Sequence, residues 1–146
     1  MSDLVVRKAE AEDVEAIENL EKQCFATPWS YDSLYKDIVE NKLALYIVAE
    51  VDGQLAGYAG VWKVVDEGHI TNVAVAPEHR RKHLASIILA TMFDVTAEEG
   101  IKKYTLEVRA GNIGAIKLYE GLGFRAEGVR PGYYEDNGED AVLMWR

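Results

Sequence analysis

Residues 44–65 form two runs of apolar residues that meet at Asp52-Gly53. An Asp-Gly pair between two such runs is a strong signal for a tight β-hairpin, because both turn positions need a backbone conformation that Asp and Gly accept. The runs Ala44–Val51 and Gln54–Val65 are therefore predicted to be antiparallel neighbours. Since a sheet must bury its apolar face, helices are expected to pack on this hairpin.

The periodicity of the rest of the chain adds further strands and helices around the hairpin. Apolar residues at helical spacing predict helices over about residues 12–25 and from Leu84 to near Gly100. Ser30 and Asn112 are suitable caps for two more helices, one ending near Asn41 and the other at Gly121 or Gly123. The remaining strands are expected at Leu4–Ala9, Ile70–Ala76, Tyr104–Arg109 and as an antiparallel pair within Phe124–Arg146. The order β-α-α-β-β-β-α-β-α-β-β predicts an α/β fold, with helices on both faces of a mixed sheet.

Composition and charge narrow the class of protein. The chain has 146 residues and no linker-like or repetitive segment, so one domain over residues 1–146 is expected. A formal net charge of −9 argues against a general nucleic-acid binder and is compatible with a cationic partner. No apolar run approaches the roughly 18–20 residues that cross a membrane, and no signal-peptide pattern is present. The single cysteine, Cys24, allows no internal disulfide, which favours a cytoplasmic location.

A basic cluster, His79–His83 (HRRKH), lies between a predicted strand and the helix that begins near Leu84. Helix N-termini present unpaired N–H groups and a partial positive charge, so they bind phosphates readily. The neighbouring cations would strengthen the attraction for a pyrophosphate. Two alternatives remain, a solvated charged turn and a DNA-recognition helix, and the second lacks a wider basic footprint.

The stretch HITNVAVAPEHRRKHLASIIL is similar to the acetyl-coenzyme A motif of the GNAT acetyltransferase superfamily. In that motif a strand of small apolar residues runs into Q/R-x-x-G-x-G/A at a helix start. Arg80 and Ala85 fit the first and last positions, but His83 stands where the family usually has glycine, so it must adopt a permitted conformation or reshape the loop. The resemblance implies that the coenzyme contacts Val73, Ala74, Val75, Arg80, Arg81, Lys82, His83, Leu84, Ala85, Ser86 and Asn112.

A second stretch, LEVRAGNIGAIKLYEGLGF, resembles the segment that follows this motif in the same superfamily. Its pattern N-x-x-A-x-x-L-Y-x-x-x-G-F is met by Asn112, Ala115, Leu118, Tyr119, Gly123 and Phe124. With Pro28-Trp29-Ser30 and the ending GYYEDNGEDAVLMW, the resemblance spans nearly the whole chain. It is greatest to the RimI type, the branch that acetylates the N-terminal alanine of a small-subunit ribosomal protein. It implies a three-layer fold, with a mixed, mostly antiparallel sheet of about seven strands flanked by about four helices.

Amide formation from an amine defines what the site residues must do. An α-amino group has a pKa near ~8, so a base must free it for attack, and the departing thiolate benefits from a proton. The resemblance assigns these roles to Glu107 and Tyr119, with direct attack in a complex of both substrates. Taken singly, Glu107 also fits a surface pair with Arg109, and Tyr119 fits an ordinary packed aromatic. Cys24 lies on the apolar stripe of the first helix and is expected to be a buried small side chain rather than an acetyl carrier.

The resemblance also places the acceptor between two loops. Trp29 and Tyr31 belong to the first loop, and Tyr133 and Tyr134 to the second. Aromatic and acidic side chains there suit a peptide with a positive terminus, such as the N-terminus of a ribosomal protein. Small amines or lysine side chains as acceptors, and a non-catalytic acyl-coenzyme-binding module, remain the alternatives. No histidine has companions at metal-ligand spacing, so no metal is predicted.

Overall fold

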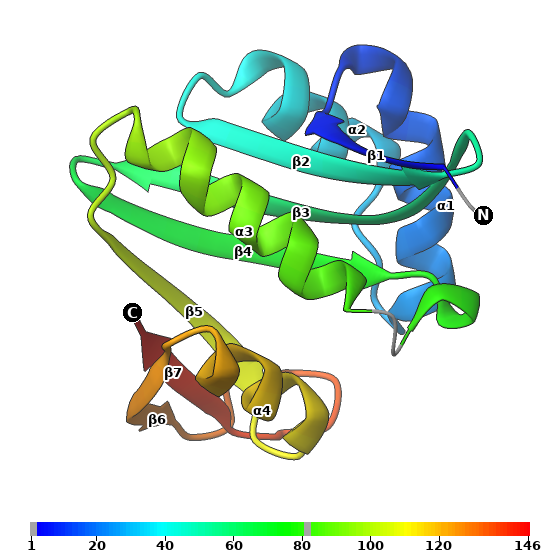
Figure 1. The fold of residues 1–146 in the computed structure, drawn as a ribbon. Coiled ribbons are helices and arrows are strands. Elements are labelled where there is room, and N and C mark those ends of the chain that lie inside the picture. Colours follow the sequence, from blue (N-terminus) through cyan, green and yellow to red (C-terminus); the bar gives the residue numbers. More distant parts are fainter. Residues whose placement is uncertain (1–2, 81–82) are drawn as a thin grey trace.

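The computed structural model describes residues 3–80 and 83–146, so Arg81 and Lys82 of the basic cluster lie outside the described residues. The strands form one seven-stranded sheet in the order β1-β2-β3-β4-β5-β7-β6 (Figure 1). Among the described strands, only β4 and β5 pair in parallel, which confirms a mixed, mostly antiparallel sheet. The strands are β1 Leu4–Lys8, β2 Ala44–Val51, β3 Gln54–Val64, β4 Glu67–Val75, β5 Lys103–Arg109, β6 Arg125–Arg130 and β7 Ala141–Trp145.

The hairpin at Asp52-Gly53 is confirmed. Both residues have positive φ, 52° and 81°, and β2 pairs antiparallel with β3. Alternate residues of β2 then enter two separate apolar clusters. Ile47 packs with α3 (Leu84–Ala97) and α4 (Ile113–Gly121), whereas Val48 packs with α1 (Val14–Cys24) and α2 (Tyr31–Tyr35). The fold therefore has three layers, with helices on both faces of the sheet (Figure 1).

Side-chain caps start two of the helices as predicted. Ser30 Oγ accepts a hydrogen bond from the backbone N–H of Ser33 at 3.2 Å, and α2 continues as a wider helical segment over Lys36–Glu40. Asn112 Oδ1 accepts one from the N–H of Ala115 at 3.1 Å. Because a cap depends on residues three positions apart, both starts could be predicted from the local sequence.

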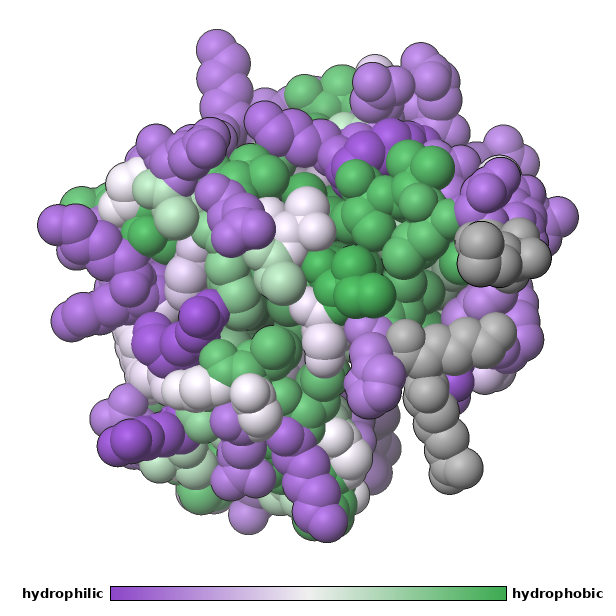
Figure 2. Space-filling view, viewed as in Figure 1, coloured by the Kyte–Doolittle hydropathy of each residue, from purple (hydrophilic) through white to green (hydrophobic). Residues whose placement is uncertain are grey.

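The exposed face on the α3 side of the sheet is partly apolar. Leu84, Ile88 and Leu89 of α3 are buried, while Ile87 on the same helix is 38% exposed. Figure 2 shows apolar side chains gathered around the start of α3 and beside β1, where Val5 is also exposed. Within the described residues no helix is both long and apolar enough to cross a membrane.

The sheet opens between β4 and β5. These strands pair only where Glu67–His69 meet Lys103–Thr105, and the rest of β5 pairs with β7 instead (Figure 1). One edge of β4 from Asn72 to Val75 therefore has a strand partner on the β3 side and none on the β5 side. Backbone N–H and C=O groups that point out from this edge can bind a ligand, except the Val75 carbonyl, which accepts from Arg80 Nε at 3.1 Å and from the Cys24 thiol at 3.5 Å. The candidate functional site lies around this opening.

Candidate active site

A cavity of about 670 Å³, the β4–α3 cavity, lies between the open edge of β4, the start of α3 and one side of α4. Every residue predicted to bind the coenzyme lines it, apart from the two outside the described residues. The predicted residues in its wall are Val73, Ala74, Val75, Arg80, His83, Leu84, Ala85, Ser86 and Asn112. The basic cluster and the small apolar strand, adjacent in the sequence, thus form a single cavity wall.

The β4–α3 cavity suits a long anionic ligand with a polar arm. His79, Arg80 and His83 are the ionisable groups that the α3 side contributes, and no Asp or Glu is among the described residues that line it. His83 caps α3 with φ 59° and ψ 20°, the left-handed conformation that glycine adopts freely. The histidine therefore keeps the loop geometry of a glycine, at a cost of about 1–2 kcal/mol. The open β4 edge offers hydrogen-bonding groups to the arm of the ligand.

A second cavity of about 570 Å³, the β4–β5 cavity, lies on the other side of the same opening. The end of α1 and the loop after it, β4, β5, α4 and the β6–β7 loop all contribute to its wall. Of the residues predicted to hold the acceptor, Trp29 and Tyr134 line this cavity. Tyr31 lines neither cavity, because it begins α2 and stacks on Tyr35 with ring centroids 6.2 Å apart. Tyr133 is 49% exposed and reaches the site through its edge-on contact with the Tyr134 ring.

Glu107 and Tyr119 both line the β4–β5 cavity. Glu107 Oε2 lies 3.2 Å from Arg130 Nε, but the direction is wrong for a hydrogen bond, and this buried oxygen accepts none from the described residues. Oε2 is covered and ion-paired with Arg130, while the Glu107 side chain as a whole is 27% exposed, so an amine or a water has to approach the part of the carboxylate that Arg130 leaves open. Tyr119 is 8% exposed and also lines the β4–α3 cavity, so its phenol stands where the two cavities meet. Burial, with a smaller effect of Tyr134, raises the pKa of Tyr119 to about 12, which keeps the phenol protonated at neutral pH.

Arg109 holds the β6–β7 loop against β5, a role that the sequence did not reveal. Its guanidinium donates to both carboxylate oxygens of Asp136, at 2.9 and 3.1 Å, and to Glu139 at 3.3 Å. It also lies 4.0 Å from the centre of the Tyr134 ring. The Arg109 hydrogen bonds lower the pKa of Asp136, so this carboxylate stays charged. The sequence did show that this loop is acidic, and acidic side chains gathered in a loop can pair with a cation from another segment.

Cys24 is not the buried small side chain that was expected. It is half-buried and lines both cavities, because α1 ends beside the open edge of β4. Its thiol donates to the carbonyl of Val75 at 3.5 Å, and Arg80 Nη2 lies 3.6 Å from the sulfur. Burial raises the pKa of the thiol despite the nearby arginine. The less nucleophilic protonated form therefore dominates, which argues against acetyl transfer through Cys24.

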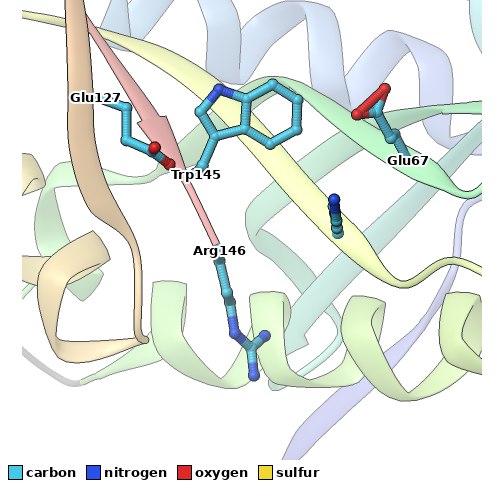
Figure 3. A pocket seen from close by; sticks show the side chains of 5 residues that line it. Glu67, Glu127, Trp145 and Arg146 are labelled. Carbon is cyan, nitrogen blue, oxygen red and sulfur yellow. The ribbon is translucent and has the colours of Figure 1, made fainter.

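A third hollow of about 410 Å³ lies at the other end of β5 and shares no lining residue with the two cavities (Figure 3). In Figure 3 the Arg146 side chain points away from Trp145 toward α3, where it lies 4.1 Å from the centre of the Phe93 ring. This hollow is therefore separate from the Glu107 and Tyr119 site. In the part of the chain that the structure describes, no three His, Cys, Asp or Glu side chains gather as a metal site.

The acetyltransferase (GNAT) family model matches residues 14–124, a range that contains both Glu107 and Tyr119. The chain belongs to the GNAT family. Members of this family use acetyl-coenzyme A, and the protein is accordingly an N-acetyltransferase. The described residues that line the β4–α3 cavity include no acidic side chain, and its strand edge is open, and both features fit such a ligand.

Individual relatives cover almost the whole chain. A Bacillus subtilis protein, provisionally named a ribosomal protein bS18-alanine N-acetyltransferase, is 41% identical over 96% of this chain and 93% of its own. The crystal structure of the ribosomal-protein-S18-alanine N-acetyltransferase from Escherichia coli superimposes with a TM-score of 0.90 at 32% identity, covering 98% and 92% of the two chains. An N-acetyltransferase from Thermoplasma acidophilum in complex with coenzyme A has a TM-score of 0.83 at 19% identity, covering 99% and 98%, and shares the fold.

Proposed function

We propose that this GNAT enzyme transfers acetyl from acetyl-coenzyme A to the α-amino group of a protein N-terminus. The acceptor that we favour is the N-terminal alanine of ribosomal protein bS18 in the cytoplasm, because relatives at 41% and 32% identity carry that activity in their names. Chain 1–146 would act as one domain. The contacts of the two cavities support the reaction, and the acceptor loops support the substrate class.

The observation that carries the proposal is the position of Tyr119 and Glu107 relative to the opening in the sheet. Tyr119 lines both cavities, whereas Glu107 lines only the β4–β5 cavity. A coenzyme along the β4 edge and an acceptor in the β4–β5 cavity would therefore meet beside Tyr119. This arrangement suits direct attack, because both substrates reach the opening from opposite sides of the β4 edge.

In the proposed reaction, one residue of the site accepts a proton from the amine and another donates a proton to the departing thiolate. Acetyl-coenzyme A supplies an activated acetyl thioester, and backbone N–H groups of Val73–Val75 polarise its carbonyl. The Glu107 carboxylate accepts a proton from the amine nitrogen, directly or through one water. The Tyr119 phenol, kept protonated by its raised pKa, donates to the departing sulfur. Asn112 and His83 fix the helix starts that frame the coenzyme.

The wall of the β4–β5 cavity favours a cationic peptide as acceptor. Among the described residues, its wall has four acidic side chains, Glu21, Glu107, Asp136 and Glu139, and one cation, Arg109, which pairs with Asp136 and Glu139. Trp29 and Tyr134 add aromatic surface for an extended chain. An α-ammonium group followed by a basic residue would find charge complementarity and apolar contact in the same cavity.

Acetyl transfer to defined peptides tests the proposal. The purified protein is incubated with acetyl-coenzyme A and peptides that begin Ala-Arg, Ser or Met, with a small polyamine as a parallel acceptor, and the acetyl position is found by mass spectrometry. We expect acetyl on the α-amino group of the Ala-Arg peptide and little on the polyamine or on lysine side chains. Transfer only to the polyamine or to lysine would contradict the proposed acceptor, and no transfer at all would contradict catalysis.

A further inference from the structure

Glu21 is a buried carboxyl group to which the proposed mechanism gives no role. It lies on α1, is 1% exposed and lines the β4–β5 cavity. Its position, four residues after Ile17 and seven after Val14, places it on the buried stripe of the helix. Buried carboxylates are normally paired with a cation, yet none pairs with Glu21 in the described part of the chain. A buried carboxyl group without a cation needs a reason beyond packing.

The hydrogen bonds of Glu21 leave one of its oxygens available. The Tyr58 hydroxyl and Asn72 Nδ2 both donate to Oε1, the latter at 3.2 Å. Oε2 accepts no hydrogen bond from the described residues, so it can receive a proton. Burial raises the pKa of this carboxyl, and the two hydrogen bonds oppose the rise. The result is a stronger base than an ordinary glutamate, in the wall of the acceptor cavity.

Two protons leave the acceptor nitrogen, and one of them is balanced by the proton that the departing sulfur takes up. An α-ammonium group carries three N–H bonds and the amide product carries one, so two protons must leave the nitrogen. Glu107 accounts for one of them. Glu21, on α1, approaches the same cavity from a different element than Glu107 on β5.

We propose that Glu21 is the second proton acceptor and takes the first proton of the acceptor's α-ammonium group. One N–H bond breaks and one O–H bond forms on the Glu21 carboxylate, directly or through one water, and the nitrogen keeps the electron pair with which it attacks. Glu107 takes the second proton once the C–N bond has formed, and this proton passes through water to Tyr119 after the phenol has protonated the sulfur. Glu21 later returns its proton to solvent. This inference rests on the proposed function, because it requires an amine in the β4–β5 cavity.

A change of activity with pH can be assigned to Glu21 only if the other ionisable groups around it keep their charge in the same pH range. Burial raises the pKa values of Tyr58 on β3, Tyr46 on β2 and Cys24 on α1, so these groups stay neutral near pH 7. Across the cavity, Tyr119 is also neutral, and hydrogen bonds lower the pKa values of Asp136 and Glu139, which stay charged. The carboxyls left to act on the amine are Glu21 and Glu107, and substitution separates them.

The test is the pH profile of kcat/KM for the Ala-Arg peptide with Glu21→Gln. Glutamine keeps the shape and can still accept from Tyr58, but it takes no proton. At pH 7 we expect a loss of about 10²-fold, typical of removing a proton-transfer group. The difference in kcat/KM between the variant and the wild type should become smaller toward pH 9.5, where an amine with a pKa near ~8 deprotonates without a base from the protein. The affinity for coenzyme A should stay unchanged, because Glu21 does not line the β4–α3 cavity.

Stability serves as the control for folding. A raised carboxyl pKa means that the folded state favours the protonated form. That contribution is full below the unfolded value of 4.5 and is lost as the pH rises through the folded pKa. At pH 7 the neutral glutamine should therefore leave the melting temperature unchanged or raise it. Tyr58→Phe is the matched second variant: it keeps the carboxyl but loses a hydrogen bond that lowers its pKa, so the activity profile should move to higher pH.

The possible outcomes separate this inference from the proposed function. A wild-type pH profile in Glu21→Gln, or a loss that persists at pH 9.5, would overturn the role of Glu21 while leaving α-amino acetylation intact. If the wild type acetylates only a small amine, the same profiles measured with that amine decide the role of Glu21. A wild type that acetylates no amine would overturn both.

Discussion

Tyr119 stands at the point where the two cavities meet, and its environment sets its chemistry. It is almost fully buried and its ring packs edge-on against Phe124, with centroids 5.8 Å apart. Burial raises its pKa to about 12, so the phenol carries a proton throughout the physiological range. A residue that served only in packing would keep its function when the hydroxyl is removed.

Tyr119→Phe is therefore expected to lower kcat by about 10²-fold or more, since it removes the proposed proton donor and keeps the ring. The packing against Phe124 should be preserved, so the melting temperature should change little. Initial rates at saturating acetyl-coenzyme A measure the effect. A kcat within twofold of the wild type would show that another group protonates the sulfur.

His83 adopts a backbone conformation that glycine normally adopts. Its φ of 59° is unfavourable for most side chains and least tolerable for β-branched ones. We expect His83→Val to lower the free energy of unfolding by about 2 kcal/mol. For His83→Gly we expect a change within about 1 kcal/mol, because relief of strain offsets the greater entropy of glycine in the unfolded chain. Urea unfolding measures both, and equal stabilities for the two variants would refute the strain.

Arg109 fixes the position of the loop between β6 and β7. The guanidinium binds Asp136 and Glu139 and lies over the Tyr134 ring, while Glu139 Oε2 accepts from the N–H of Gly111 at 2.7 Å. These contacts join β5, the start of α4 and the loop. This part of the β4–β5 cavity wall is therefore ordered by charge pairs rather than by an apolar core.

Arg109→Ala is expected to raise the KM for the Ala-Arg peptide about tenfold and to leave the KM for acetyl-coenzyme A unchanged. Losing these charge-assisted hydrogen bonds frees the loop, whereas the β4–α3 cavity has no contact with Arg109. Arg125→Ala, an exposed arginine on β6, is the matched control. Equal effects of the two substitutions on the peptide KM would argue against the loop contact.

The elements that could be predicted from the sequence are those specified locally. The Asp52-Gly53 hairpin, the Ser30 and Asn112 caps and the final pair of strands each depend on residues close in the chain, and the structure confirms them. β4 begins at Glu67 rather than Ile70, because the turn after β3 is tight, with Val65 at φ 58°. The position of β7 between β5 and β6 depends on pairing between distant segments, which no local pattern encodes.

The residues of the candidate site also fall into two groups, those that could be predicted from the sequence and those that could not. The alternation along β5 indicated where Glu107 points, and the resemblance gave Tyr119 and the lining of the β4–α3 cavity. The Arg109 contact with the loop and the burial of Glu21 were missed, since both arise from side chains that meet across the fold. Glu21 had a signal, a carboxylate on the apolar stripe of α1. Cys24 was misread because the same stripe ends beside the open strand edge.

The opening between β4 and β5 determines where the two cavities of the candidate site lie. The parallel pairing stops at His69–Thr105, and the two cavities lie on either side of the gap. One cavity has a basic rim and the other an acidic wall. Two substrates of opposite charge would thus be directed to opposite sides of the same strand edge.

The net charge of −9 should act on the acceptor before it binds. We expect kcat/KM for the Ala-Arg peptide to fall several-fold between about 50 and 500 mM salt, because salt screens the attraction between an acidic protein and a cationic peptide. A peptide beginning Ala-Ala and lacking basic residues is the control and should respond less. An identical salt response for the two peptides would show that charge plays no part in acceptor selection.

We propose that the acceptor's α-amino nitrogen lies in the β4–β5 cavity while the coenzyme occupies the β4–α3 cavity. A crystal structure with coenzyme A covalently joined to an alanine peptide tests both positions at once. We expect the peptide nitrogen within hydrogen-bond reach of Glu107, directly or through one water, and the sulfur beside the Tyr119 hydroxyl. A peptide bound away from Glu107, or a coenzyme that does not follow the open edge of β4, would contradict this arrangement.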